Sequence, residues 1–569
     1  MPDWLRRAAP IIAAAALGLV VVVLLEPVSR SESHIWKVAL CVVTIGLVLW
    51  RAFKGEVWLR TWRFVATAGV VLGAGAYYNF DRDFAEGMGD YTDAAYYYLN
   101  SKYFDELGYF GLYEGILLAD AEGADRMGSE LKQVRNLRDY ELEPAAVALE
   151  RAPQVKARFT PARWEAFRHD AEFFLAKTKV EHLKRNFFVD HGYNPPPPWT
   201  LVGGTLSSLV PVEHVKVAAM VDVGLVVLMF VAIGWALGVD ALLLALLFWF
   251  CTLSGRWPVM GHSILRFDWV AGVVIGICAL RRGRTGLGGA ALAWATMSRV
   301  IPAVFWGCAA LALFVRALRE RSIPGPLRGF SAGTVLMVGL VGGLSLLDVG
   351  LDGYRASVAN LRMHDDAAEA YSSQKVGFGD AVFFRGETTR EAMAATACGF
   401  LERRVAGVDC DTHGDAVTGK NKGNGIAGKG VLVHSIRPLL RVLGGLVLAL
   451  IAANTWRRRR DPEDLVHLGL LLIFVLTTPS YYYFTIRIVL VLYHLAWLHR
   501  RRDQVGLVLL FTIEAISNWT MLLGWQRYAT TALLSWMLLG YFAWLVGSWR
   551  WKPVPSGAEA CHPLAGGPP

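Results

Sequence analysis

The sequence predicts an all-α protein that crosses a membrane many times. Of its 569 residues, 54% are hydrophobic and only 18% are charged, whereas a soluble protein of this length carries more charge and spreads its apolar residues in short amphipathic periods. The apolar residues come in runs of about twenty, the length of helix that crosses roughly 30 Å of hydrocarbon. The net charge of +9 comes from short basic clusters between these runs, so it reflects membrane topology rather than binding to nucleic acid.

Length alone places about fourteen transmembrane helices along the chain. The first follows Arg6 and Arg7 as the core of a signal peptide would. Its apolar stretch is long, however, and no small-residue cleavage site follows, so we expect a retained anchor. The expected spans cover residues 8–25, 35–50, 63–77, 214–237, 239–254, 264–280, 286–300, 301–317, 329–348, 432–454, 463–480, 481–498, 504–523 and 529–549.

Basic clusters between the spans set the expected orientation. If the spans alternate from a cytoplasmic N-terminus, every cluster falls on the cytoplasmic side. The two long polar loops then lie outside, which predicts a multi-pass protein of the bacterial cytoplasmic membrane with its site on the extracytoplasmic face. The clusters occupy residues 6–7, 51–63, 281–284, 316–321, 456–460, 499–502 and 549–552.

These features divide the chain into six regions. The last of them is rich in Pro, Gly and Ala, and we expect it to be a disordered cytoplasmic tail. The regions are N-terminal spans (1–77), a first extracytoplasmic loop (78–213), a central transmembrane bundle (214–348), a second extracytoplasmic loop (349–431), a C-terminal transmembrane bundle (432–552) and the tail (553–569).

Both outer loops are predicted to contain amphipathic helices. In the first loop, Thr160 is expected to cap a helix that has Pro161 at its first position. The loop ends at Pro195–Pro198, which we expect to run extended, either as a stiff connector or as a substrate contact. In the second loop, residues 352–371 predict a surface helix, and the Gly-, Asn- and Lys-rich part after it predicts a flexible loop.

The first outer loop carries an acidic and aromatic stretch, GMGDYTDAAYYYLNSKYF, at Gly87–Phe104. Asp90 and Asp93 lie about one helical turn apart beside three tyrosines, and an ionised carboxylate can accept a proton as a general base. Earlier in the loop, Asp81 and Asp83 form a D-x-D pair that would hold a divalent metal such as Mg or Mn; no other cofactor is indicated. The alternative for all four carboxylates is a solvated acidic surface.

Several ionisable residues fall within or beside the expected spans, where a charge is costly. Taken one at a time, each arginine is explained by snorkelling or by a buried ion pair. Taken together, most lie toward the outer half, where guanidinium groups would bind a lipid phosphate with paired hydrogen bonds. The two deeper carboxylates, Asp222 and Glu514, would form an interhelical polar pair. The residues are Asp222, Arg266, Asp268, Arg299, Arg487 and Glu514.

The cysteines fit an oxidising outer compartment. Cys398 and Cys410 are the only pair that shares an outer loop. A disulfide between them and two free thiols are both open.

Four stretches resemble the polytopic GT-C glycosyltransferases. GDYTDAAYYYLNSKYFDELGYFGLYEG resembles their acidic first-loop motif, and YNPPPPWTLVGGTLS resembles their proline-containing re-entry segment. RFDWVAGVVIGICALRRGRTGLGGAALAWATMSRVIPAVFWG resembles the hairpin of the polyprenyl-phosphate-mannose-dependent (GT87-like) branch, and YRASVANLRMHDD resembles an outer-loop segment with a late histidine. Two features depart from the pattern: the acidic loop follows the third span rather than the first, and the hairpin's basic residue, Arg299, is often lysine.

The resemblance implies a membrane glycosyltransferase that moves a mannose-like hexose or a pentose, with inversion, from a polyprenyl-phosphate donor to a glycan, lipid or protein acceptor. Its general base would be Asp93, or alternatively Asp90. Asp93 is preferred because Tyr96 and Tyr97 follow one turn later and would form a platform for the sugar. The donor would be bound by Arg266, Arg299, Arg362, His364 and Arg487.

Other classes remain open. A transporter or flippase for lipid-linked saccharides would use the same arginines but would more often show internal repeats. An O-antigen-ligase-like protein would rely on outer Arg and His without an acidic first loop. A non-catalytic scaffold would leave the intramembrane charges unexplained. In each case the expected partners are membrane lipids and lipid-linked sugars, not nucleic acid.

Overall fold

The structure is a computed structural model that describes residues 3–54, 58–81, 91–255, 263–366, 374–404, 427–458 and 460–549. These residues are almost entirely helical. The named strands among them are β1 (Gln133–Arg135) and β2 (Leu142–Pro144), which pair antiparallel. The predicted all-α class is confirmed.

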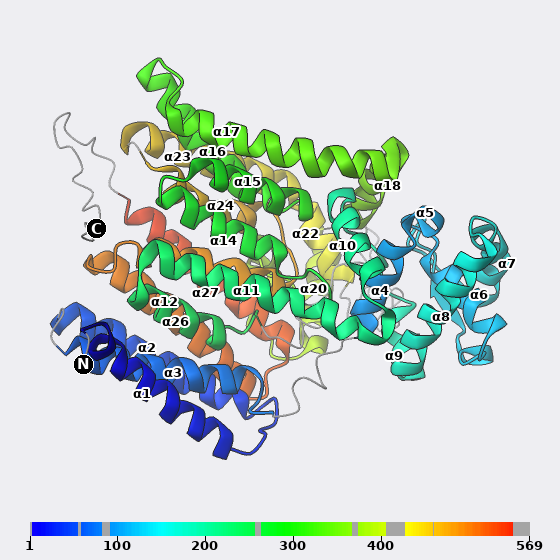
Figure 1. Ribbon diagram of the computed structural model, residues 1–569, viewed down its shortest axis with the longest axis horizontal. Coiled ribbons are helices and arrows are strands. Elements are labelled where there is room, and N and C mark those ends of the chain that lie inside the picture. Colours follow the sequence, from blue (N-terminus) through cyan, green and yellow to red (C-terminus); the bar gives the residue numbers. More distant parts are fainter. Residues whose placement is uncertain are drawn as a thin grey trace.

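The N-terminal helices pack along one side of the helical body (Figure 1). They are α1 (Asp3–Leu24), α2 (Ser33–Lys54) and α3 (Leu59–Tyr77). Helix α2 lies against α26 (Arg501–Leu522), and α3 lies against α12 (Val239–Cys251). Helices α2 and α3 therefore connect the N-terminal helices to both the central and the C-terminal helices.

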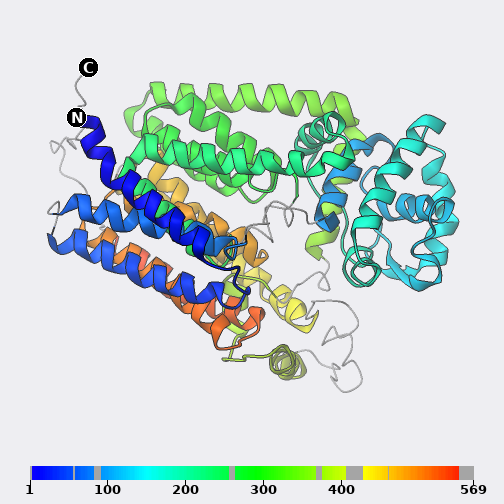
Figure 2. The same ribbon diagram turned by 60° about the horizontal axis from the view of Figure 1, so that its bottom comes forward.

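The first outer loop folds into a helical unit at one end of this body, drawn in blue and cyan in Figures 1 and 2. Buried aromatic side chains fill its core, with Tyr98, Tyr103 and Phe167 fully buried. Its elements are α4 (Tyr91–Lys102), α5 (Phe104–Leu107), α6 (Leu112–Glu122), η1 (Gly128–Glu130), α7 (Ala145–Lys156), α8 (Pro161–Lys177), α9 (Val180–His182), the π-helical η2 (Leu183–Phe187) and α10 (Pro197–Leu209).

Two local predictions can be compared with this unit. Thr160 caps α8, because its hydroxyl oxygen accepts a hydrogen bond from the Arg163 amide at 3.3 Å. The expectation for the proline run is only half right. Pro196 is extended, but Pro197 and Pro198 form the first turn of α10, where a proline loses no helical hydrogen bond.

The remaining elements form the helical body and its connections. They are η3 (Val212–His214), α11 (Val215–Leu237), α14 (Asp268–Arg281), α15 (Thr285–Ser298), α16 (Ala303–Glu320), α17 (Gly325–Met337), η4 (Val338–Gly342), α18 (Gly343–Asp366), α19 (Phe378–Phe383), α20 (Arg390–Arg404), α22 (Ala427–Ser435), α23 (Arg437–Arg458), α24 (Pro462–Leu476), η6 (Tyr481–Arg487), α25 (Ile488–Leu495) and α27 (Arg527–Gly547).

Among the described residues, six helical segments are long and apolar enough to cross a membrane. The expected count of about fourteen is therefore not met. Several expected spans form helices that are too short: α14 has 14 residues and extends only about 21 Å. A hydropathy pattern does not show where a helix begins and ends. The six are Ser33–Lys54, Val212–Leu237, Gly325–Asp365, Arg437–Arg458, Arg501–Leu522 and Arg527–Gly547.

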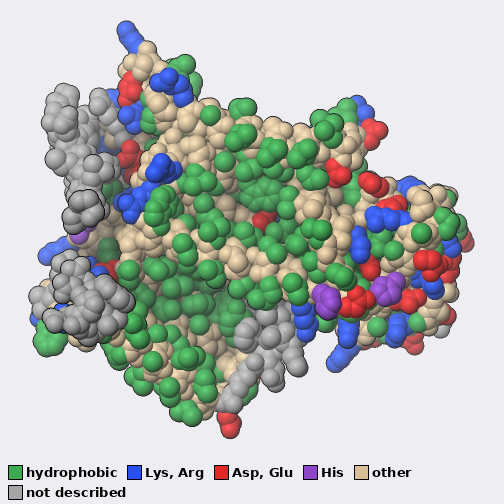
Figure 3. Space-filling view, viewed as in Figure 1, with side chains coloured by type: hydrophobic (Ala, Val, Ile, Leu, Met, Phe, Trp, Pro, Cys, Tyr) green, Lys and Arg blue, Asp and Glu red, His purple; other side chains and the backbone are tan. Residues whose placement is uncertain are grey.

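The surface agrees with a membrane protein. Figure 3 shows hydrophobic side chains over the middle of the helical body, with charged side chains gathered at its ends and over the outer helical unit. Large apolar side chains are exposed on several helices, including Leu336 (69%) and Leu347 (84%). A soluble monomer rarely exposes continuous apolar areas of this kind.

The two outer loops meet at the same end of the body (Figure 1). Helix α18 contains a non-helical residue, Gly350, with φ +67°. Its second half covers the surface helix predicted at 352–371 as far as residue 366, and residues 367–371 lie outside the described part of the chain. Asn360 on this half accepts a hydrogen bond from the Tyr140 hydroxyl at 2.9 Å and donates one to the Tyr193 carbonyl at 3.0 Å. These bonds attach α18 to the outer helical unit.

Candidate active site

A carboxylate and a guanidinium meet at the junction between the outer helical unit and the body. Asp93, in the first turn of α4, lies 3.2 Å from Arg266 (Oδ2 to Nε). Their side chains are 26% and 10% exposed, so Asp93 is partly accessible from outside the protein and Arg266 only slightly. Two residues that are 173 positions apart in sequence, and that were expected to share one site, are therefore in contact.

Tyr97 lies at the centre of this group. Its ring centroid is 4.9 Å from the Arg266 guanidinium and 5.9 Å from that of Arg299, and Arg266 also donates a hydrogen bond to its hydroxyl. Burial raises the pKa of Tyr97 to about 12, with the Arg266 charge opposing that shift. The hydroxyl therefore keeps its proton at neutral pH.

Other aromatic rings enclose the two guanidiniums. Trp199 from α10 lies 5.5 Å from Arg299 and packs edge-on against Tyr97. Tyr482 from η6 lies 5.8 Å from Arg266. Cation–π contacts of this kind hold a guanidinium without neutralising its charge. The Arg266–Asp93 site is defined here as Asp93, Tyr97, Trp199, Arg266, Arg299 and Tyr482.

The backbone at Arg266 is held in an uncommon conformation. The preceding residue, Leu265, has φ +52°, which is unfavourable for a residue with a side chain and persists only when neighbours fix it. The Trp199 indole donates to the Leu265 carbonyl at 3.2 Å. The Asp222 carboxylate accepts from the amides of Arg266 and Phe267, both at 2.9 Å. Asp222 is thus a positioning residue for Arg266.

Arg299 is positioned by the end of α15. It is the C-cap residue of that helix, and its guanidinium donates to the Ser298 carbonyl at 3.0 Å. The Ser298 hydroxyl in turn donates to Asp268, the first residue of α14. This bond ties the two helix ends that carry Arg266 and Arg299.

Helix α4 presents different residues to different neighbours. Tyr96 faces the core of the outer helical unit, where it stacks on Phe187 with ring centroids 4.5 Å apart and donates to the Phe187 carbonyl at 2.7 Å. The expected sugar platform is therefore divided: Tyr97 lies at the site, whereas Tyr96 is a packing residue. Successive helical positions are about 100° apart, and this separates them.

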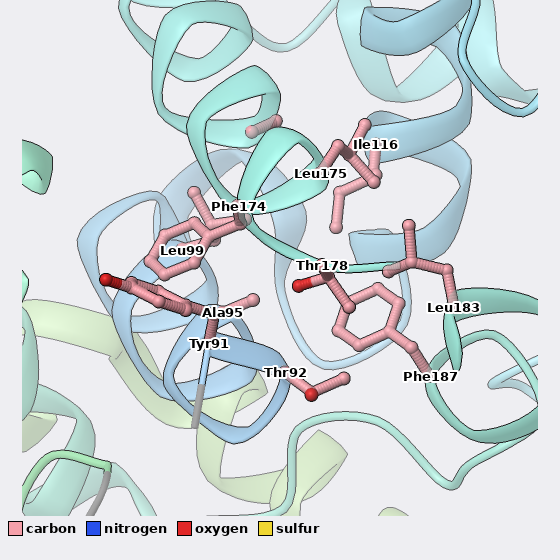
Figure 4. Close-up of a pocket in the computed structure, with 11 residues that line it drawn as sticks. Tyr91, Thr92, Ala95, Leu99, Ile116, Phe174, Leu175, Thr178, Leu183 and Phe187 are labelled. Atoms are coloured by element: carbon pink, nitrogen blue, oxygen red, sulfur yellow. The ribbon is translucent and has the colours of Figure 1, made fainter. Parts of the chain in front are cut away.

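A small cavity lies on the face of α4 opposite Asp93. Figure 4 shows Tyr91, Thr92, Ala95 and Leu99 of α4 facing residues of α8 and η2 across it. Its volume is ≈ 10 Å³, room for about one water molecule. It is too small for a sugar, so the accessible chemistry of α4 is on the Asp93 face.

Arg487 was expected to bind the donor, but the structure places it in an internal ion pair. It lies 2.8 Å from Glu514, and the two side chains are 1% and 0% exposed. It also donates to Thr252 and Ser254 at 3.2 and 3.0 Å. The expected pairing of Glu514 with Asp222 is therefore wrong. Glu514 pairs with Arg487.

Arg362 and His364 do not join the Arg266–Asp93 site. Arg362 is exposed on α18. His364 is half-buried, with its ring 5.4 Å from His191 and 6.1 Å from Tyr140, and its Nδ1 has no hydrogen-bond partner among the described residues. Both residues lie on the half of α18 that contacts the outer helical unit.

Several predicted residues fall outside the described part of the chain, namely Asp83, Asp90 and Cys410. Asp81 is described and exposed. No group of three or more His, Cys, Asp or Glu side chains that could hold a metal is found among the described residues. Cys398 is disulfide-bonded; its expected partner, Cys410, lies outside the described residues, so that pairing stays a prediction.

Sequence reasoning did not identify Trp199, Tyr482 or the positioning role of Asp222. Trp199 follows the proline run directly, and a large aromatic residue at the start of a membrane re-entry segment was an available indication. Tyr482 is one of three consecutive tyrosines at 481–483. Nothing in the pattern distinguishes which of the three faces Arg266.

Comparison with known proteins gives no further assignment. The chain matches no family model, no curated protein and no solved structure. Its function therefore has to be inferred from the geometry of the described residues.

Proposed function

We propose that the protein is an integral membrane glycosyltransferase that transfers a sugar from a polyprenyl-phosphate donor to an acceptor hydroxyl, with inversion at the anomeric carbon. The observation that carries the proposal is the contact between an accessible carboxylate, Asp93, and a guanidinium, Arg266, with a second guanidinium, Arg299, on the same tyrosine ring. The reaction requires a base and an anion-binding group within one site, on opposite sides of the anomeric carbon.

The chemistry assigns one role to each charge. Asp93 accepts the proton of the acceptor hydroxyl, which needs an approach of about 3 Å. The hydroxyl oxygen forms a bond to the anomeric carbon as the bond from that carbon to the donor phosphate breaks. Arg266 and Arg299 stabilise the negative charge that develops on the leaving polyprenyl phosphate. Tyr97, which keeps its proton, would donate a hydrogen bond beside them.

The ion pair suggests how donor binding and base activity are coupled. Asp93 is paired with Arg266. A phosphate that binds Arg266 competes with Asp93 for the guanidinium, because each accepts from the same donor groups. Donor binding would therefore release Asp93 to accept a proton from the acceptor.

The membrane setting follows from the same proposal. Six helical segments could cross a bilayer, and the site lies at the end of the body where both polar loops meet. We place this end on the extracytoplasmic face of the cell membrane, where activated sugars arrive on lipid carriers. The acceptor would be a glycan, lipid or protein on that face.

The test is reconstitution of the purified protein in lipid nanodiscs with polyprenyl-phosphate mannose or polyprenyl-phosphate arabinose and a pool of cell-envelope glycans and lipids. The expected result is release of polyprenyl phosphate together with a labelled acceptor. Movement of intact donor across a proteoliposome membrane, with no phosphate release, would instead identify a flippase and refute the proposal.

A further inference from the structure

A second cleft, of ≈ 340 Å³, lies between the outer helical unit and α18. This volume is within the range of small-molecule sites. One wall is formed by the segment Phe104–Gly111 with Arg138 and Arg158, and the other by Val349, Asp352, Gly353 and Ala356 of α18. Both walls lie at the end of the body where α5 and the second half of α18 meet (Figure 1).

The lining combines one partly exposed aromatic ring with charges of both signs. Phe110 contributes that ring, whereas Phe104 and Tyr109 are buried behind it, at 9% and 2% exposure. Two arginines and two carboxylates, Asp105 and Asp352, are exposed in the same cleft.

The two arginines of the lining are held in place by the outer helical unit. Glu114 accepts two hydrogen bonds from the Arg138 guanidinium, at 2.6 and 2.9 Å. The Arg158 guanidinium donates to the Glu106 carbonyl at 3.3 Å. Both guanidiniums therefore have contacts within the outer helical unit.

The backbone leaves the cleft open. Gly108 has φ +56°, and no atom lies within 4 Å of where its Cβ would be. Gly350, with φ +67°, interrupts α18 between Val349 and Asp352. Both sides of this interruption therefore contribute to one wall.

The cleft is close to the Arg266–Asp93 site. The ring centroids of Phe104 and Tyr109 lie 6.2 and 5.9 Å from that of Tyr193, which lies 6.4 Å from that of Tyr97. One buried aromatic ring, Tyr193 at 1% exposure, therefore separates the lining of the cleft from the centre of the site. The cleft and the site are neighbours on two sides of this ring.

We infer that this cleft binds the acceptor, and that the acceptor is a carbohydrate chain. The inference rests on the proposed function and adds the acceptor class to it. Sugar hydroxyls both donate and accept hydrogen bonds, and their apolar ring faces pack on aromatic side chains. A phosphate-rich ligand would meet Asp105 and Asp352, and a lipid tail would remove water from four exposed charged groups.

The test is binding of the full-length protein, in detergent and without donor, to an array of cell-envelope oligosaccharides. We expect the wild type and Asp93→Asn to bind the same subset of glycans. Phe110→Ala and Arg158→Ala should each weaken that binding at least tenfold, whereas Arg185→Ala, an exposed arginine of the same unit outside the cleft, should not. Asp352→Asn, on the opposite wall, provides a second test if an outer-unit variant fails to fold.

Absence of glycan binding by the wild type, or unchanged binding by folded cleft variants, would overturn the inference. The proposed transfer reaction would not be affected, because it is measured by release of polyprenyl phosphate. Conversely, the wild type could bind glycans through the cleft and yet release no polyprenyl phosphate. That result would support a glycan site in the cleft and refute the transfer reaction.

Discussion

The molecule contains two arginine–carboxylate pairs of the same chemistry in different surroundings. Arg266 and Asp93 are 3.2 Å apart and partly exposed, at 10% and 26%, whereas Arg487 and Glu514 are 2.8 Å apart and fully buried, at 1% and 0%. Both arginines were expected to bind the donor. Only the accessible pair is placed to exchange its partner for a ligand.

The difference shows that a charge in an apolar sequence does not by itself mark a binding site. Arg487 also donates to Thr252, Ser254 and the Phe484 carbonyl, at 3.2, 3.0 and 3.1 Å. A guanidinium with all its groups engaged in the interior holds helices together. Arg266 is instead surrounded by aromatic faces, which leave its charge available for a phosphate.

The largest expected effect is on turnover. Asp93→Asn removes the proton acceptor, so the rate of polyprenyl-phosphate release should fall by about 10²–10⁴-fold, as for other general bases. Asp139→Asn, at an exposed turn of the same unit, is the matched control. Wild-type turnover in Asp93→Asn would transfer the base role to another group, with Asp90 the first candidate.

The buried pair is predicted to act on stability. Arg487→Ala leaves Glu514 as an unpaired buried charge, which costs about 3–5 kcal/mol of stability. The double variant Arg487→Met with Glu514→Leu should lose less than either single substitution. Thermal unfolding in detergent measures both effects. An Arg487→Ala protein that unfolds like the wild type but binds donor poorly would reverse the distinction between the two pairs.

Arg299 sharpens the comparison within the accessible site. Arg299→Ala should raise the KM for the donor about tenfold, the loss of one charge-assisted contact. Arg299→Lys should recover only part of it, because an ammonium cannot bind phosphate with a planar fork. Arg282→Ala controls for the loss of one positive charge, because Arg282 is the C-cap residue of α14 and lies outside the site. Equal KM values for all four proteins would exclude Arg299 from the site.

The two tyrosines of α4 give a smaller, paired test. Tyr97→Phe removes the hydroxyl that Arg266 contacts and should raise the donor KM a few-fold with stability unchanged. Tyr96→Phe removes the 2.7 Å bond to Phe187 and should cost about 1 kcal/mol of stability with the donor KM unchanged. The opposite result, in which Tyr96→Phe raises the donor KM and Tyr97→Phe lowers stability, would place the sugar platform on the Tyr96 face of α4.

The smallest expected effect is the pH dependence of a half-buried lysine. Burial lowers the pKa of Lys375 to about 8, while the Asp380 carboxylate opposes that shift. Above this pH the unfolded chain binds more protons than the folded one, so stability should rise between about pH 8 and about pH 10. The melting temperature of the wild type should therefore gain a few degrees over this range relative to that of Lys375→Met. Parallel curves of melting temperature against pH for the two proteins would show that folding does not lower the pKa of Lys375.

The sequence predicted the helical class and the position of the acidic loop because both depend on local composition. It overestimated the number of spans because apolar windows do not show how long a helix is: α14 and α15, each expected to cross the membrane, have only 14 residues. It expected Asp93 and Arg266 in one site, from the predicted side of the membrane and from the family resemblance, and the two side chains are in contact. It could not separate Tyr96 from Tyr97, or Arg266 from Arg487, because packing decides which side chains stay accessible.

Titration of polyprenyl phosphate into wild-type protein and into Asp93→Asn, Arg266→Ala and Arg282→Ala, followed by intrinsic tryptophan fluorescence in nanodiscs, tests the exchange of partners at Arg266 most directly. We predict tighter binding by Asp93→Asn, at least tenfold weaker binding by Arg266→Ala, and wild-type affinity for Arg282→Ala. Loss of binding in Asp93→Asn, or equal affinity in all four proteins, would contradict the account.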